Sequence, residues 1–142
     1  MTLTRDRMME LLAATPLLHG VDGAGLTRIA ERAIEVTFTA GHVIARQGEV
    51  GTGLFIVVSG GTRVVRDGST VTTLGPGDFF GELSVLDGKP RNAQVIAEGE
   101  TVCLALATWD FEAVVADQPT VALAILRGLA ARLRTVTEEH RH

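Results

Sequence analysis

The sequence predicts an α+β protein that is mainly β: an antiparallel β-roll, or jelly roll, between N-terminal helices and C-terminal closing helices. Three observations support this prediction. Between residues 34 and 108, short runs rich in β-branched and apolar residues are separated by Gly-containing turns. Apolar residues recur at helical spacing before this region and again after it. Strands that follow one another through short Gly-rich turns favour an antiparallel roll over a βαβ sheet.

Two short helices are expected before the roll. The first covers residues 5–14 and stops near Pro16, because proline cannot continue a helix. Asp22 is suited to cap the second helix, since its carboxylate can accept hydrogen bonds from the first backbone amides. The apolar residues at helical spacing in this second helix are Leu26, Ile29, Ala30 and Ala33.

The middle of the chain is predicted to contain seven strands. They lie around residues 36–38, 43–46, 54–60, 62–67, 70–74, 93–98 and 101–108. Asp67-Gly68 separates the fourth from the fifth, and this dipeptide is a strong signal for a two-residue hairpin turn.

Two closing helices are expected after the roll. Thr108 is suited to cap the first, and Pro119 lies near the start of the second, where its missing N–H costs little. The second helix covers residues 119–140, and ~20 residues of helix span ~30 Å, more than a lid on a small roll requires. We therefore expect this helix to serve for closing and for dimerisation. Its apolar stripe, which is either core or dimer seam, consists of Val121, Ile125, Leu129, Leu133 and Val136.

Length, charge and cysteine content restrict the class of protein. The 142 residues suffice for one domain with a real core, and we expect residues 1–142 to form that domain. A formal net charge of −4 with scattered basic residues argues against nucleic acid as a direct partner. Apolar stretches such as residues 54–58 are far shorter than the ~20 residues of a membrane span. No secretory signal is recognisable, and a single cysteine, Cys103, suits a reducing compartment, so we expect a cytoplasmic protein.

Residues 75–95 contain the groups best suited to bind an anion. Two turn glycines precede a Phe80-Gly81 step into an apolar turn, and Arg91 follows ten residues after Gly81. Amides freed by glycine, a helix N-terminus and a guanidinium are groups that proteins use to hold a phosphate. Glu82 lies among them and would repel a phosphate unless it faced a hydroxyl. The pattern therefore predicts a sugar phosphate as the ligand.

Each of these residues also has a purely structural explanation. Arg91 can donate two parallel charged hydrogen bonds to a phosphate, or it can form an ion pair with Glu82. Gly81 lets the backbone approach a ligand, but a plain tight turn would need it as well. The amides of Leu83 and Ser84 begin the short helix whose positive end would face the phosphate. Glu82 would in any case stabilise that helix N-terminus by its charge.

Several of these segments are similar to a known family. Phe80–Leu86, followed by Pro90–Ala93, resembles the phosphate-binding cassette of the cyclic nucleotide-binding domain family. The upstream segment from Gly41 to Gly60, with its glycines in register, resembles the first strands and turns of that family. The resemblance covers roughly residues 10–137 and implies a β-roll with an embedded phosphate-binding cassette.

The resemblance further implies a regulatory sensor domain that binds cAMP, with cGMP as the alternative, and that uses no cofactor. Glu82 would accept from the ribose 2′-hydroxyl, and Asn92 and Ala93 would follow Arg91 with a further amide. Family members often carry a hydroxyl residue at the position of Asn92 when they bind guanine, and a small residue or serine when they bind adenine. An amide can donate or accept, so it does not choose the base. Thr52 departs from the family, in which many members carry an acid that braces the arginine.

The last helix is implied to cover the base and to carry the signal. Leu133 and Val136, with Arg132 and Thr137, fall where related proteins lay side chains over the purine. Ligand binding would favour a closed cassette and swing this helix inward. The expected output is a homodimer through the helix or contact with an unknown effector protein. Related transcription regulators continue into a DNA-binding motif, and related kinases and channels carry a catalytic or pore domain.

Two other classes of function compete with the sensor. An interaction or scaffold module would keep the same fold without binding nucleotide. The β-roll also hosts metal-dependent cupin enzymes, which need a His-x-His pair with further ligands inside the roll. No Ser/His/Asp or Cys/His arrangement is recognisable either, so we expect no catalytic and no metal-binding residues. The four histidines, which are isolated or terminal, are His19, His42, His140 and His142.

Overall fold

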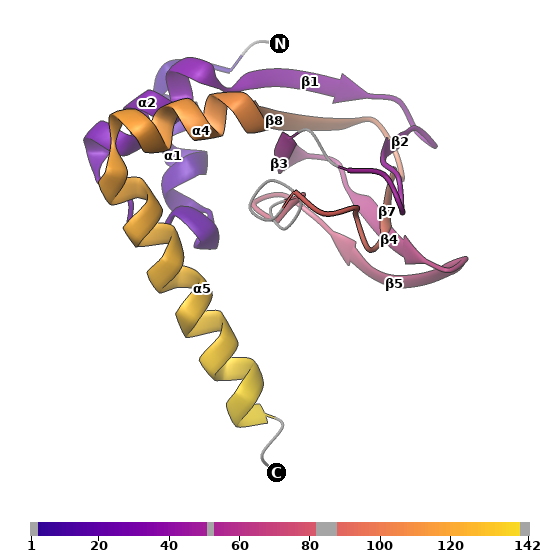
Figure 1. Cartoon of the computed structure of the whole chain (residues 1–142). Coiled ribbons are helices and arrows are strands. Elements are labelled where there is room, and N and C mark those ends of the chain that lie inside the picture. The colour runs from indigo at the N-terminus through magenta and orange to yellow at the C-terminus, as the bar shows by residue number, and fades with distance from the viewer. Residues whose placement is uncertain (1–2, 51–52, 82–87, 140–142) are drawn as a thin grey trace. The chain divides into compact units, whose positions relative to one another are not determined.

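The computed structural model describes residues 3–50, 53–81 and 88–139, and the chain falls into two compact units (Figure 1). The β unit runs from Arg32 to Asp110. The helical unit combines Leu3–Glu31 with the chain from Phe111 onwards. Each unit is described below by itself.

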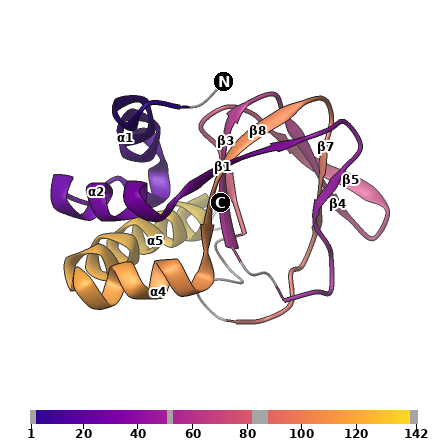
Figure 2. The ribbon, with the colours of Figure 1, turned by 90° about the horizontal axis from the view of Figure 1, so that it is seen from above.

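The β unit consists of two antiparallel sheets, which confirms the predicted roll (Figures 1 and 2). The first sheet has the order β1-β8-β3-β6, and its strands are Ile34–Phe38, Thr101–Ala107, Gly53–Ser59 and Phe79–Phe80. The second sheet has the order β2-β7-β4-β5, and its strands are Val43–Ala45, Gln94–Ala97, Thr62–Arg66 and Ser69–Leu74. All seven predicted strands are present. The two-residue strand β6 was not predicted, because it lies in a Gly-rich stretch that indicates only turns.

Side chains from both sheets form the core of the β unit, and Cys103 and Val57 are fully buried in it. The aromatic rings of Phe55 and Phe80 are stacked, with centroids 5.1 Å apart, and Phe38 meets Phe55 edge-on. Phe80 is thereby held only 6% exposed at the point where the chain leaves β6. Aromatic pairs of this kind add to the stabilisation that comes from their buried area.

The β4–β5 hairpin confirms the predicted two-residue turn. Asp67 and Gly68 have φ angles of 52° and 81° and lie between Arg66 and Ser69. Positive φ at both central residues is the mark of a type I′ turn, whose twist matches that of the flanking strands. Asp67 is the only described non-glycine residue with positive φ, and aspartate tolerates this conformation better than most residues.

The helical unit is formed by helices from both ends of the chain, seen from above in Figure 2. They are α1 (Arg5–Ala14), η1 (Pro16–Leu18), α2 (Gly23–Arg32), α4 (Thr108–Asp117) and α5 (Pro119–Glu139). Helix α1 ends before Pro16 as predicted, and Asp22 accepts a 2.8 Å hydrogen bond from the amide of Gly25, which confirms the predicted cap of α2. Val21 and Val121 lie so close to Gly25 that they would contact any side chain there, so α2 packs directly on α5.

One sequence prediction about the closing helices needs correction, and the open alternative for the α5 stripe is resolved along the helix. Thr108 does not cap α4: it is the first helical residue, and its buried hydroxyl has no hydrogen bond among the described residues. The apolar stripe of α5 is not uniform. Val121 and Ile125 are buried in the helical unit, whereas Leu133 is exposed, because the C-terminal half of α5 runs beyond the other helices (Figure 1).

Among the described residues, no single helix is both long and apolar enough to cross a membrane. The pair α4 and α5 meets the length and composition test only together, and the two helices are bent by 112° at the break between them.

Candidate functional site

The structure brings together two of the residues that the sequence assigns to an anion site, Gly81 and Arg91. The terminal nitrogens of the Arg91 guanidinium would lie 2.7 and 3.4 Å from a Cβ placed on Gly81. One of them, Nη2, donates a 3.0 Å hydrogen bond to the carbonyl oxygen of Gly53, at the start of β3. The guanidinium is therefore fixed in orientation beside the chain that leaves β6.

Gly81 is required at this point for two physical reasons. Its φ angle is +90°, which L-residues with a side chain rarely adopt. A Cβ there would also lie 2.6 Å from the carbonyl oxygen of Gly53, a backbone atom that cannot move aside easily. The plain tight turn considered above explains the φ angle alone, whereas the close approach of the Gly53 carbonyl, to which Arg91 is hydrogen-bonded, explains why the space must be empty.

The backbone of Arg91 is held by the segment that follows β2. The amide of Arg91 donates to the carbonyl of Glu49 at 2.7 Å, and the amide of Gly48 donates to the carbonyl of Arg91 at 2.8 Å. A β-bridge between Val50 and Pro90 continues this antiparallel pairing. The guanidinium thus extends from a residue whose backbone amide and carbonyl are both hydrogen-bonded to the same segment.

The partly buried position of Arg91 favours binding of an anion. A guanidinium carries five N–H donors, so a bond to one carbonyl orients the group and is compatible with a second, bidentate partner. Hydrogen bonds from a charged donor to phosphate gain strength where solvent is partly excluded. The arrangement suits a planar pair of phosphate oxygens better than a point contact.

Phe80, Asn92 and Ala93, which the sequence also assigns to the site, are the chain neighbours of Gly81 and Arg91. Phe80 anchors the end of β6 through its stacked ring. Ala93 is buried immediately before β7, whereas the side chain of Asn92 is exposed. The carbonyl of Asn92 accepts a 3.2 Å hydrogen bond from Arg66.

The described structure does not place the other predicted site residues relative to Gly81 and Arg91. Glu82, Leu83, Ser84 and Thr52 lie outside the described residues. The ion pair between Glu82 and Arg91 that the sequence left open is therefore not described either. Leu133 and Val136 lie on α5 in the helical unit and are 67% and 46% exposed.

Sequence reasoning missed three participants in the site. The carbonyl of Gly53 orients Arg91, and no side-chain pattern signals a backbone acceptor. Gln47 and Asp67 hold the 47–49 segment, as described below, and their proximity depends on the pairing of strands that are distant in sequence. The Asp67-Gly68 turn and the glycines between Gly41 and Gly60 were recognisable in the sequence, but neither pattern indicates that Gln47 and Asp67 are partners.

Nothing among the described residues points to metal chemistry. No three of the described His, Cys, Asp and Glu side chains lie close enough together to hold a metal ion. The described residues of this region supply hydrogen-bond donors and a positive charge, which can bind and orient an anion.

Comparison with known proteins shows which family the chain belongs to. Residues 35–118 match the family described as cyclic nucleotide-binding domain. Over 137 residues the chain is 36% identical to a CRP-like cAMP-activated global transcriptional regulator of Mycobacterium tuberculosis, covering 89% of this chain and 59% of that protein. The chain thus spans somewhat more than half the length of this relative.

Two solved structures are similar to this one. The N-terminal domain of a transcriptional regulator from Streptomyces coelicolor A3(2) aligns with a TM-score of 0.80 at 31% identity, covering 91% of this chain and 93% of that one. The Thermus thermophilus catabolite activator protein aligns with a TM-score of 0.76 at 34% identity, covering 89% and 62% respectively. With its β-roll, its Gly81–Arg91 arrangement and this family match, the chain belongs to the cyclic nucleotide-binding domain family.

Proposed function

We propose that this chain is a regulatory domain that binds a cyclic nucleotide, most favourably cAMP, with Arg91 on the cyclic phosphate. The observation that carries the proposal is the fixed guanidinium of Arg91 against the side-chain-free face of Gly81. Two hydrogen bonds from a guanidinium to phosphate oxygens are charge-assisted and give geometric specificity. The name of the Mycobacterium tuberculosis relative, a cAMP-activated regulator, supports cAMP as the first ligand to test.

The remaining ligand contacts follow the sequence expectations. Phe80 and Gly81 position the cassette, Glu82 accepts from the ribose 2′-hydroxyl, and the amides of Leu83 and Ser84 face the phosphate. Acceptance by an acid from the ribose 2′-hydroxyl would favour a nucleotide over a free phosphate, which has no ribose. Asn92 and Ala93, which follow Arg91 in the sequence, offer a further amide to the ligand.

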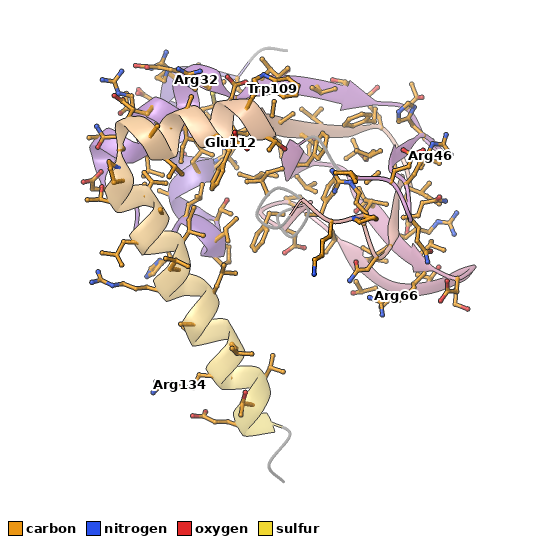
Figure 3. The ribbon with its side chains drawn as sticks, in the orientation of Figure 1. Arg32, Arg46, Arg66, Trp109, Glu112 and Arg134 are labelled. Atoms are coloured by element: carbon orange, nitrogen blue, oxygen red, sulfur yellow. The ribbon has the colours of Figure 1, made fainter. Side chains whose placement is uncertain are left out.

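Helix α5 is the proposed output element and the proposed homodimer surface. Its exposed apolar residues Leu123, Leu126 and Leu133, with Ala130, recur at intervals of three, four and three residues. This is the spacing of a coiled-coil seam, in which each residue packs into a hole on a partner helix. The side chain of Arg134 points away from the helix into solvent (Figure 3). A change of α5 on ligand binding would thus be passed to a second copy or to an effector.

Isothermal titration calorimetry with cAMP, cGMP and 5′-AMP tests the proposal. We expect dissociation constants in the micromolar range or tighter for a cyclic nucleotide, with cAMP preferred. The non-cyclic 5′-AMP serves as the control, because it keeps the base and ribose but changes the charge and shape of the phosphate. Absence of binding by both cyclic nucleotides would contradict the proposal and would favour the scaffold module instead.

A further inference from the structure

The tip of the β4–β5 hairpin is tied to the segment after β2 by a reciprocal pair of hydrogen bonds. The side-chain amide of Gln47 donates from Nε2 to the carboxylate of Asp67 at 2.8 Å. Its Oε1 in turn accepts from the backbone amide of Asp67 at 3.1 Å. One side chain therefore engages both the side chain and the backbone of the turn residue.

The tied segment is the one that holds the backbone of Arg91. Gly48, next to Gln47, donates its amide to the carbonyl of Arg91, and the carbonyl of Glu49 accepts from the amide of Arg91. Any displacement of the 47–49 segment therefore moves the backbone from which the guanidinium extends. Asp67 is hydrogen-bonded to Gln47, and Gly48, the next residue along the chain, is hydrogen-bonded to Arg91.

A second tie runs from the same hairpin to the residue after Arg91. Arg66, the last residue of β4, donates from Nε to the carbonyl of Asn92 at 3.2 Å. Figure 3 labels Arg66 on this hairpin. The hairpin thus contacts both strands of the short ribbon formed by residues 48–50 and 90–92.

The conformation of the turn makes this tie specific. Asp67 has positive φ, and its backbone amide is directed to Gln47 as part of the two-residue turn. Both side chains are solvent-exposed, so the pair contributes little to overall stability. Loss of this pair should therefore have a local effect. It should lower the fraction of molecules in which the backbone of Arg91 has the correct geometry, with little change in the free energy of unfolding.

We propose that Gln47 and Asp67 are positioning residues for ligand binding, because the hairpin tip holds the backbone of Arg91 through them. The proposal rests on the proposed function for its effect on affinity, but its structural part does not need a ligand. The apparent affinity falls in proportion to the fraction of molecules in which Arg91 has the geometry that binds the ligand. By reciprocity, a ligand on Arg91 should also make the hairpin tip open less often.

Three isosteric variants separate this role from an effect of charge. Gln47→Glu replaces the Nε2 donor by an oxygen that faces the Asp67 carboxylate, so this hydrogen bond is lost and the two carboxylates repel each other, which weakens the tie. Asp67→Asn keeps an acceptor for Nε2 and tolerates positive φ, so it serves as the matched control. In the double variant, the new amide at position 67 donates to the new carboxylate at position 47, and the net charge equals that of the wild type.

Hydrogen exchange of the ligand-free protein, followed residue by residue by NMR, gives the first readout. We expect Gln47→Glu to speed exchange of the Gly48 and Arg91 amides about three- to tenfold. Asp67→Asn should stay within about twofold of the wild type, and the double variant should return most of the protection. Amides in the β1–β8 pairing should be unchanged in all variants, which excludes general destabilisation.

The dissociation constant for cAMP gives the second readout. We expect Gln47→Glu to bind about three- to tenfold more weakly, with affinity recovered in the double variant. Unchanged exchange at Gly48 and Arg91 in Gln47→Glu overturns the positioning role, whatever the affinity. Faster exchange without recovery in the double variant overturns it too, because charge or side-chain shape would then explain the effect. If exchange behaves as expected but the wild type binds no cyclic nucleotide, the proposed function fails and the positioning of Arg91 stands.

Discussion

The guanidinium of Arg91 lies beside Gly81 in the space that a side chain at position 81 would need. Its Nη1 atom would be 2.7 Å from a Cβ on Gly81, well inside van der Waals contact. The carbonyl of Gly53, which accepts from Nη2 of the same guanidinium, would lie 2.6 Å from that Cβ. The start of β3, the end of β6 and Arg91 thus meet at one point, and the absence of a side chain at position 81 allows it.

Replacing Gly81 by alanine should damage both stability and the geometry of Arg91. The positive φ costs about 1–2 kcal/mol in any residue with a Cβ, and the contact with the Gly53 carbonyl adds to it. We expect the free energy of unfolding to fall by about 2–4 kcal/mol, measured by urea denaturation, and cAMP binding to weaken at least tenfold.

Gly77→Ala is the matched control for this substitution. Gly77 has a φ of +91°, but a Cβ there meets nothing within 4 Å. It should therefore lose about 1–2 kcal/mol through backbone strain alone and keep its ligand affinity. Equal effects of the two substitutions on affinity would show that the space beside Gly81 is not needed for binding.

Burial raises the pKa of the Cys103 thiol from 9.0 to about 11. Because the folded-state pKa lies above the unfolded one, the resulting stability is fully present below about pH 9 and is lost as the pH rises toward 11. We expect the free energy of unfolding to fall by up to about 3 kcal/mol over this range. Denaturation curves at several pH values should show that the free energy of unfolding declines less steeply with pH in Cys103→Ala than in the wild type. Equal declines would mean that the pKa of the thiol does not change on folding.

Asn92 is the site at which base preference should be adjustable. Its side chain is exposed, so a substitution there need not disturb the packing of the roll. Asn92→Thr introduces the hydroxyl that family members often carry for guanine, and one hydrogen bond can change affinity up to about tenfold. We expect the ratio of cGMP to cAMP affinity to rise by about three- to tenfold in calorimetry. An unchanged ratio would place base selection elsewhere.

The exposed seam of α5 should govern self-association. Leu133 is 67% exposed, and a glutamate there would have to be desolvated in a helix–helix seam. We expect Leu133→Glu to weaken a homodimer at least tenfold, measured by sedimentation equilibrium with and without cAMP. Arg134→Gln, at the next position along the same helix, should have a smaller effect. A wild-type protein that stays monomeric at all concentrations would contradict the proposed dimer.

Local signals in the sequence were sufficient for most of the fold. The Asp67-Gly68 turn, the Asp22 cap and the helix end before Pro16 depend on residues within a few positions of one another, so their physics can be read from the sequence. Strand periodicity likewise located the strands, except for the two residues of β6. The Thr108 cap failed because a suitable residue type does not ensure that the hydroxyl faces the helix amides.

The site was only partly predictable because its geometry depends on long-range pairing. Gly81 and Arg91 are only ten residues apart in sequence, and their chemistry indicated an anion. The Gly53 carbonyl and the Gln47–Asp67 pair contribute through strands whose register no local pattern fixes. The sequence left core and dimer seam open for the apolar stripe of α5, because periodicity shows which residues share a face but not how far along the helix that face is covered.

The affinity of cAMP for the wild type and for Arg91→Ala tests the central claim most directly. Loss of charge-assisted hydrogen bonds worth about 1.5–3 kcal/mol should weaken binding by roughly ten- to a hundredfold. Arg63→Ala, which removes an equal charge from an exposed position on β4, should bind within about twofold of the wild type. If Arg91→Ala also binds cAMP as tightly as the wild type while remaining folded, the phosphate does not lie on this guanidinium and the account is wrong.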